Sequence, residues 1–136
     1  MMLLADALCY LQRFDDCIKV VDDTLAWTER AGVKDYDPEL YRIKAAAVTG
    51  SGMGSLAARA SAADLLNQSL TVSENLGNRS WQLRSAMDLA ELWNSDEHGQ
   101  AARGLVERIY RTFTEGWDTH DLSRARTLLE TRFQAK

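Results

Sequence analysis

A short pattern of small residues recurs along this chain at a nearly constant interval. Leu4-Ala5, Ala46-Ala47 and Leu89-Ala90 align, and their second residues are separated by 42 and 43 positions. Periods of about 20 to 50 residues are typical of repeat proteins, in which each repeat is one unit that packs on the next. This period restricts the possible folds more than any other feature of the sequence.

Each copy also contains a second small residue that is followed four positions later by an aliphatic one. Such pairs are typical of helical hairpins in which small side chains let two helices cross closely, as in tetratricopeptide repeats. The period exceeds the usual length of about 34 residues, so we expect longer helices, and a HEAT-like array is the structural alternative. The pairs are Cys17 with Val21, Ala62 with Leu66, and Ala102 with Val106, the middle pair being shifted by an insertion rich in Gly and Ser at 50–55.

Apolar residues at helical spacing run through the whole sequence, and no segment alternates as a strand would. The spacing predicts an all-α fold of about seven helices, arranged as antiparallel hairpins in a right-handed solenoid similar to tetratricopeptide repeats. We expect one domain, 1–136, with hairpins at roughly 2–31, 38–76 and 80–114 and a C-terminal capping helix at 120–133. The individual helices are expected at 2–12, 14–31, 38–49, 56–76, 80–94, 98–114 and 120–133.

Residues suited to helix ends mark these boundaries. Side chains that accept a hydrogen bond at an N-cap precede the helices, and glycines that can adopt a left-handed conformation follow them. The expected N-caps are Asp37 before Pro38, Asn78 or Ser80, Asp96, and Asp118 or Thr119, and the expected closing glycines are Gly32, Gly77 and Gly116.

Composition narrows the classes of partner. The chain has 16 Lys and Arg against 20 Asp and Glu, for a net charge of −4, and it lacks the positive charge needed to bind nucleic acid or an anionic membrane. No apolar run is long enough for a membrane span, and the start carries no signal peptide, which predicts a cytoplasmic protein. Cys9 and Cys17 fit no disulfide scaffold or zinc motif and are expected to be free thiols.

Residues 40–130 resemble a known family, the C-terminal tetratricopeptide-like region of large bacterial signalling ATPases. In that family the region follows a P-loop ATPase module, often preceded by a class III adenylate/guanylate cyclase domain or a winged-helix DNA-binding domain. The chain departs from the family pattern at Ala45, where glycine is usual, and at Trp117, where phenylalanine is usual. The resemblance is carried by Leu40-Tyr41-Arg42-Ile43-Lys44, Trp81-Gln82-Leu83-Arg84-Ser85-Ala86, Leu89-Ala90-Glu91-Leu92-Trp93 and the stretch from Phe113 to Leu122.

The resemblance implies a regulatory region without catalysis of its own. No G-x-x-x-x-G-K-[ST] loop is present, so neither the ATPase nor the cyclase activity is transferred to this chain. Within the most specific stretch, we expect Gly116 to end a helix, Trp117 to fold back onto that helix, and Asp118 with Asp121 to cap the last one.

The remaining reactive side chains are better explained by structure than by chemistry. His120 lies near Glu115, Asp118 and Asp121, but acids near helix ends are expected for electrostatic reasons, and His98 is distant in sequence. Cys17 occupies a position that asks for a small apolar residue. Trp27, Trp81, Trp93 and Trp117 are expected to pack between helices instead of forming an aromatic ligand box. We therefore predict no catalytic residue, no metal and no cofactor.

Binding is the function that such an array offers, because the first helix of each hairpin lines a concave face. We expect a non-catalytic protein-interaction or sensory module whose partner is a protein or peptide segment. Two alternatives stay open: self-assembly as a homodimer through the N-terminal helix, where no earlier repeat covers Leu4, Leu8 and Leu11, and an enzyme whose pocket brings titratable groups together. Counting from the small positions places Tyr41, Lys44, Val48, Arg84, Met87 and Glu91 on the binding face.

Overall fold

The computed structural model describes residues 2–93 and 97–131, and within these ranges the chain forms seven α-helices and no strand. The predicted all-α class is confirmed, whereas the N-cap expected at Asp96 lies outside the described residues. The helices are α1 (Met2–Tyr10), α2 (Phe14–Ala31), α3 (Asp37–Ser51), α4 (Leu56–Leu76), α5 (Arg79–Trp93), α6 (Glu97–Tyr110) and α7 (His120–Glu130).

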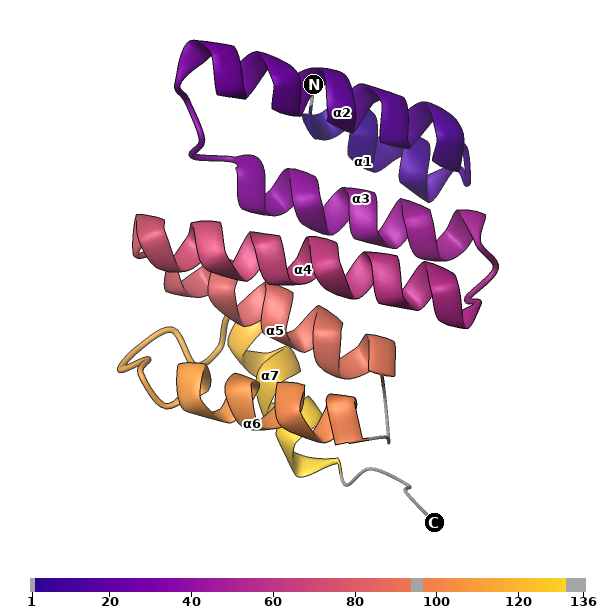
Figure 1. Ribbon diagram of the computed structural model, residues 1–136. Helices are drawn as coiled ribbons and strands as arrows, with labels where there is room; N and C mark the ends of the chain where they lie inside the picture. Colours follow the sequence, from indigo (N-terminus) through magenta and orange to yellow (C-terminus); the bar gives the residue numbers. More distant parts are fainter. Residues whose placement is uncertain (1, 94–96, 132–136) are drawn as a thin grey trace.

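The helices are stacked side by side in chain order, from α1 and α2 at one end to α6 and α7 at the other (Figure 1). Consecutive helices pack on one another, and α3 also contacts α1 and α5, while α5 contacts α7. Among the described residues, the even-numbered helices make no such contacts with one another. The odd-numbered helices α1, α3, α5 and α7 therefore form a continuous layer, whose surface is called the odd-helix face below.

The repeated small residues lie where the helices cross. Ala5, Ala47 and Ala90 are each completely buried. The methyl group of alanine is small enough for a close helix crossing and still fills the space that water would enter. This explains why alanine recurs at each hairpin. The second positions of the repeat are buried as well: Cys17, Val21, Ala62, Leu66, Ala102 and Val106.

Two clusters of buried side chains fill the interior, and α3 contributes to both. Leu40 and Ala47 belong to the cluster shared with α1 and α2, whereas Ala45 belongs to the larger cluster shared with α4 to α7. The N-terminal end of α3 is also tied to α4 and α5 by hydroxyl groups. Ser69 Oγ donates to the Pro38 carbonyl over 2.9 Å and lies 2.6 Å from Ser85 Oγ.

Several helix ends confirm the residues expected there. Gly32 and Gly77 close α2 and α4 in the left-handed conformation, with φ of +71° and +68°. The side chain of Asn78 accepts a hydrogen bond from the Trp81 amide at the start of α5. At α7 the N-cap is Thr119, which accepts from the Leu122 amide, and not Asp118.

Two other ends differ from expectation. Asp37 does not cap α3, because its carboxylate is turned towards α2 and accepts a hydrogen bond from Thr28 Oγ1 over 2.9 Å. Helix α6 stops at Tyr110 rather than 114, since the amides of Thr112 and Phe113 bond to carbonyls only three residues back and tighten the turn. Gly116, with φ of +77°, therefore lies in the connecting loop and closes no helix.

The prediction for the loop residue Trp117 is confirmed, because its ring packs against Tyr110 with centroids 5.2 Å apart. The first helix is shorter than expected and ends at Tyr10, since Gln12 takes a positive φ of 61° and breaks the helical path.

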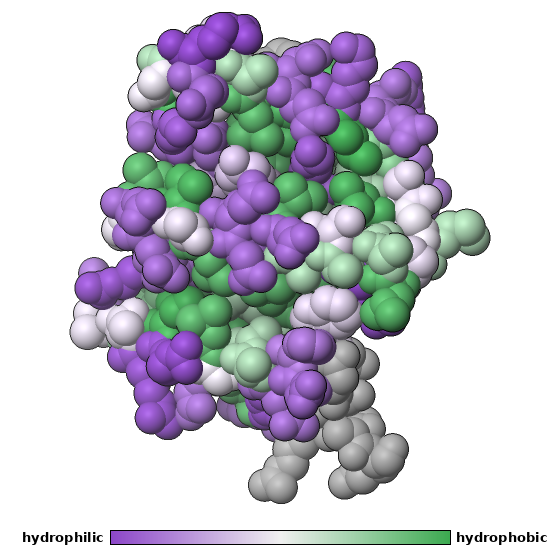
Figure 2. All heavy atoms as spheres, viewed as in Figure 1, coloured by the Kyte–Doolittle hydropathy of each residue, from purple (hydrophilic) through white to green (hydrophobic). Residues whose placement is uncertain are grey.

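The surface mixes charged and apolar side chains. Figure 2 shows one face of the molecule, on which hydrophilic side chains are dense over α2 and hydrophobic ones are visible between polar residues further along the stack. Within the described residues, no helix combines the length and the hydropathy that a membrane span requires.

Candidate functional site

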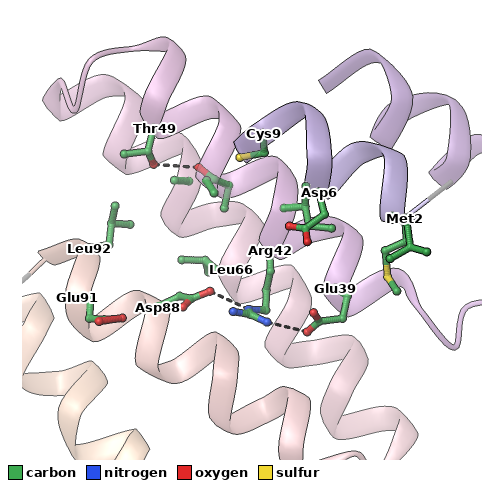
Figure 3. A pocket seen from close by; sticks show the side chains of 15 residues that line it. Met2, Asp6, Cys9, Glu39, Arg42, Thr49, Leu66, Asp88, Glu91 and Leu92 are labelled. Carbon is green, nitrogen blue, oxygen red and sulfur yellow. Dashed lines mark hydrogen bonds and ion pairs between the residues drawn. The ribbon is translucent and has the colours of Figure 1, made fainter. Parts of the chain in front are cut away.

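A pocket of about 540 Å³ opens on the odd-helix face, across α3 and between α1 and α5 (Figure 3). Its base is mostly aliphatic, and carboxylates from three helices surround that base. The lining residues are Met2, Leu3, Asp6 and Cys9 of α1; Glu39, Arg42, Ile43, Ala45, Ala46 and Thr49 of α3; Ala62 and Leu66 of α4; and Asp88, Glu91 and Leu92 of α5.

Arg42 is the one cation among the described residues that line this pocket, and two carboxylates hold it. Its Nε lies 2.7 Å from Asp88 Oδ2, and its Nη1 lies 2.8 Å from Glu39 Oε1, as the dashed lines in Figure 3 mark. Glu39 is one turn before Arg42 on α3, whereas Asp88 comes from α5. The guanidinium therefore ties the two neighbouring odd helices together.

The ion pairs continue from the pocket to the last helix. Arg84 Nε of α5 lies 2.7 Å from Asp121 Oδ2 of α7, and its Nη1 lies 3.6 Å from Glu39 Oε2. Arg124 of α7 in turn contacts α5. Its Nη2 lies 3.0 Å from Asp88 Oδ1 and also pairs with Glu91. These contacts form one network, called the arginine network below, which joins α3, α5 and α7.

The electrostatics of Arg42 follow from its position. Burial by itself would lower the pKa of this guanidinium, but the charges and hydrogen bonds of Asp88 and Glu39 outweigh burial and raise the pKa above its ordinary value. The same balance, with Asp88 and Glu91 as partners, raises the pKa of Arg124. Both side chains therefore keep their positive charge, and that charge is already compensated.

The two cysteines lie together at the α1–α2 hairpin as free thiols. Burial, and then the charge of Asp6, raises the pKa of Cys9, which lines the pocket. Burial, and then the neighbouring Cys9, raises the pKa of Cys17 to about 11, and its Sγ donates to the Ala5 carbonyl over 3.2 Å. Thiols held in the protonated form are poor nucleophiles, and the packing role expected for Cys17 is confirmed by its complete burial.

The residues predicted for α5 divide between surface and core. Arg84 is half-buried in the arginine network, and the exposed side chain of Glu91 lines the pocket. Met87 was wrongly predicted to face a partner, since it is completely buried in the larger core cluster. It is three residues from Arg84 and four from Glu91, and neither of those two is buried.

The residues predicted for α3 miss the pocket. Lys44 is directed towards α2, where its Nζ lies 2.7 Å from Asp22 Oδ1. Tyr41 and Val48 are half-buried, and neither lines the pocket. Burial, and then the charge of Asp37, raises the pKa of Tyr41. The sequence prediction selected residues one position away from those that line the pocket. Since one residue rotates the side chain by about 100° around an α-helix, the predicted residues lie on the neighbouring side of α3.

Of the charged residues that line the pocket on α3 and α5, the sequence prediction included Glu91 and missed Glu39, Arg42 and Asp88. Glu39 and Arg42 are three residues apart, and Arg84, Asp88 and Glu91 follow at spacings of four and three. Charges of opposite sign at such spacings share one helix face, so this pattern was an available signal.

The two histidines, His98 and His120, do not line the pocket. His98 packs on Trp93 with ring centroids 5.2 Å apart, and His120 is exposed at the start of α7. Among the described residues, no three His, Cys, Asp or Glu side chains are arranged to hold a metal ion.

The tryptophans also differ from expectation in part. Trp81 packs with ring centroids 5.8 Å apart against Tyr36, which lies in the turn before α3 and not in a helix. Trp27 and Trp117 are exposed by 55% and 40%, so these two are not core residues.

A scan against protein-family models, a search of curated proteins and a search of solved structures each found no match to this chain.

Proposed function

We propose that this chain is a non-catalytic protein-interaction module that binds a protein or peptide segment on its odd-helix face. The observation that carries the proposal is the open pocket across α3, whose aliphatic base and charged surround are both accessible from one side. Pockets of about 300 to 1,000 Å³ with mostly apolar walls and a few polar groups are typical of binding sites.

We further propose that the helices are arranged as a right-handed solenoid similar to tetratricopeptide repeats. Contacts between the odd helices, together with the lack of contact between even helices in the described part of the chain, favour a stack that is tighter on the odd-helix side. A stack of that kind curves around the tighter side, where repeat proteins bind their partners. The resemblance of residues 40–130 further favours a sensory or regulatory role, similar to the C-terminal region of signalling ATPases.

An enzyme is less well supported, although titratable groups do converge in the pocket. Glu39 and Asp88 are both engaged by guanidinium groups, which occupy the oxygens that acid–base chemistry would need. Cys9 lines the same pocket, and its raised pKa keeps it protonated. The convergence therefore serves to hold the odd helices together.

The proposal is tested by filling the pocket. Ala46 is an exposed alanine of α3 that lines it, and Ala60 is an exposed alanine of α4 that does not. Immobilised wild type, Ala46→Trp and Ala60→Trp are compared by quantitative mass spectrometry of the proteins they capture from lysate of the native host. We expect equal melting temperatures and a partner that Ala46→Trp alone fails to capture. Identical capture by all three would contradict the proposal.

Self-assembly is the second candidate, and the exposed side of α1 and of the turn that follows it favours it. Leu4 and Leu11 are 47% and 62% exposed, seven residues apart, and Leu3 and Tyr10 repeat the same spacing beside them. Such a stripe leaves apolar area in water that a second copy can cover. Leu8 was expected to share this exposure but is only 8% exposed, because it packs in the N-terminal core cluster.

Light scattering after size-exclusion chromatography tests this second candidate. Leu4→Glu with Leu11→Glu should convert a dimer into a monomer, because two charges would be buried at the contact. The matched control is Leu56→Glu with Leu76→Glu, two exposed leucines of α4. A monomeric wild type would exclude self-assembly through α1.

A further inference from the structure

The charges around the odd-helix pocket do not balance. Three guanidinium groups face five carboxylates, so two negative charges are left over. Each guanidinium contacts two carboxylates and has no charge to spare for an anionic ligand. The cations are Arg42, Arg84 and Arg124, and the anions are Asp6, Glu39, Asp88, Glu91 and Asp121.

The excess negative charge lies on two sides of the pocket. Asp6, on α1, is exposed and forms no ion pair among the described residues. Glu91, on α5, is 54% exposed and has Arg124 as its partner. Figure 3 shows Asp6 and Glu91 on either side of Arg42, on the two helices that flank α3. A ligand lying across α3 therefore meets a carboxylate at each side.

Beside Arg42, the surface between the two carboxylates carries aliphatic side chains. Ile43 and Leu92 present aliphatic side chains to the pocket, and Ala46 leaves room above α3. The methylene stem of a lysine or arginine packs favourably on such a surface while its charged end reaches a carboxylate. An acidic segment would instead lose its hydration against like charges, without a free cation in return.

We propose that the odd-helix pocket binds a basic peptide segment, in which lysine or arginine side chains pair with Asp6 and Glu91 and aliphatic neighbours pack on Ile43, Ala46 and Leu92. This inference rests on the proposed interaction function and adds the chemistry of the partner. Charge complementarity selects the basic segment over an acidic one, since the arginine network is already satisfied.

Binding is measured by fluorescence anisotropy with three short labelled peptides of equal length, in which lysine, glutamate or glutamine alternates with leucine and serine. The full chain is used as wild type, as Asp6→Asn with Glu91→Gln, and as the control Asp15→Asn with Asp23→Asn. Asp15 and Asp23 are exposed on α2, outside the pocket, so both double variants change the net charge equally. The control separates local pairing from general attraction to an acidic protein.

We expect the lysine peptide to bind best and its affinity to fall about tenfold in the pocket variant, with little change in the control. The preference should weaken as salt is raised, because the carboxylates are partly exposed. Equal or tighter binding of the glutamate peptide, the same loss in both double variants, or no binding of any peptide would overturn the inference. The proposed function is judged separately by the comparison of Ala46→Trp with Ala60→Trp.

The thiol of Cys9 gives an independent measure of where the peptide binds. Cys9 lines the pocket and is half-buried, whereas Cys17 is completely buried and serves as an internal reference. Alkylation by N-ethylmaleimide is followed by mass spectrometry of the wild-type chain with each peptide. The lysine peptide should slow the modification of Cys9 and the glutamate peptide should not. Unchanged alkylation of Cys9 at saturating lysine peptide would show that the peptide binds elsewhere.

Discussion

The same substitution, glycine to alanine, is expected to have opposite effects at two helical positions of this protein. Alanine is favoured over glycine inside a helix by about 1 kcal/mol, because glycine loses more backbone entropy on folding. At Gly104, in α6, an added β-carbon would meet no heavy atom within 4 Å in the described part of the chain, apart from the backbone of α6 itself. Gly104→Ala should therefore stabilise the fold by about 0.5 to 1 kcal/mol.

At Gly50, in α3, the added β-carbon would lie 2.4 Å from Cζ of Phe14 and 2.7 Å from its Cε1. Contacts this short require the ring or the helix to move by about 1 Å to reach ordinary van der Waals distance. Phe14 is packed between α2 and α3 beside the N-terminal core cluster, so its movement disturbs that packing. Overpacking of this kind costs about 1 to 3 kcal/mol, which exceeds the gain in helix propensity. Gly50→Ala should destabilise the fold by about 1 to 2 kcal/mol after that gain is subtracted.

Thermal unfolding by circular dichroism measures both variants against the wild type. For a chain of this size, 1 kcal/mol corresponds to a shift of about 3 to 4 °C in Tm. We expect Tm to rise for Gly104→Ala and to fall for Gly50→Ala. The double variant Phe14→Leu with Gly50→Ala should recover part of the loss, because the smaller side chain makes room for the new methyl group. A higher Tm for Gly50→Ala would refute the packing argument.

Three further predictions concern buried polar groups. Arg42→Met should lower the free energy of unfolding by about 1 to 3 kcal/mol in urea titrations, because Arg42 is only 18% exposed and its loss leaves Asp88 and Glu39 with fewer partners. The control Lys19→Met breaks an exposed ion pair and should change the free energy of unfolding by less than about 0.5 kcal/mol. Ser69→Ala should cost about 1 to 3 kcal/mol in the same assay, because it leaves the Pro38 carbonyl without its buried donor, and an unchanged midpoint would contradict this. Burial raises the pKa of Asp37 above its ordinary value, so ionisation of this carboxyl opposes folding as pH rises through the folded-state pKa. The Tm advantage of Asp37→Asn over wild type should therefore be larger at about pH 7 than at about pH 4. A difference in Tm that does not vary with pH would refute the assignment.

The repeat period predicted the buried positions of this fold well. Ala5, Ala47 and Ala90 share a spacing in the sequence and complete burial in the structure. Local chemistry also predicted several helix ends, such as Gly77 and Asn78, because the groups that end a helix are adjacent in the chain. Predictions of this kind succeed when the interaction that decides them lies within a few residues.

Asp37 and Met87 show where local reasoning fails. The Asp37 carboxylate had the right position for an N-cap, but Thr28 of the preceding helix offered it a buried hydrogen bond. Met87 is three residues from Arg84 and four from Glu91, yet it is completely buried in the core that α5 shares with its neighbours. In both cases a partner distant along the chain determines where the side chain goes.

The sequence by itself therefore determined that the chain is helical, how many helices it forms, and which small residues lie at their crossings. The tertiary structure decided which face of each helix is buried and which lines the pocket. Packing of α3 between α2, α4 and α5 sets its rotation, and a shift by one residue replaces Tyr41 and Lys44 by Arg42 and Ala45, which both line the pocket. Periodicity gives the relative positions of side chains around a helix, whereas their absolute direction depends on contacts with other helices.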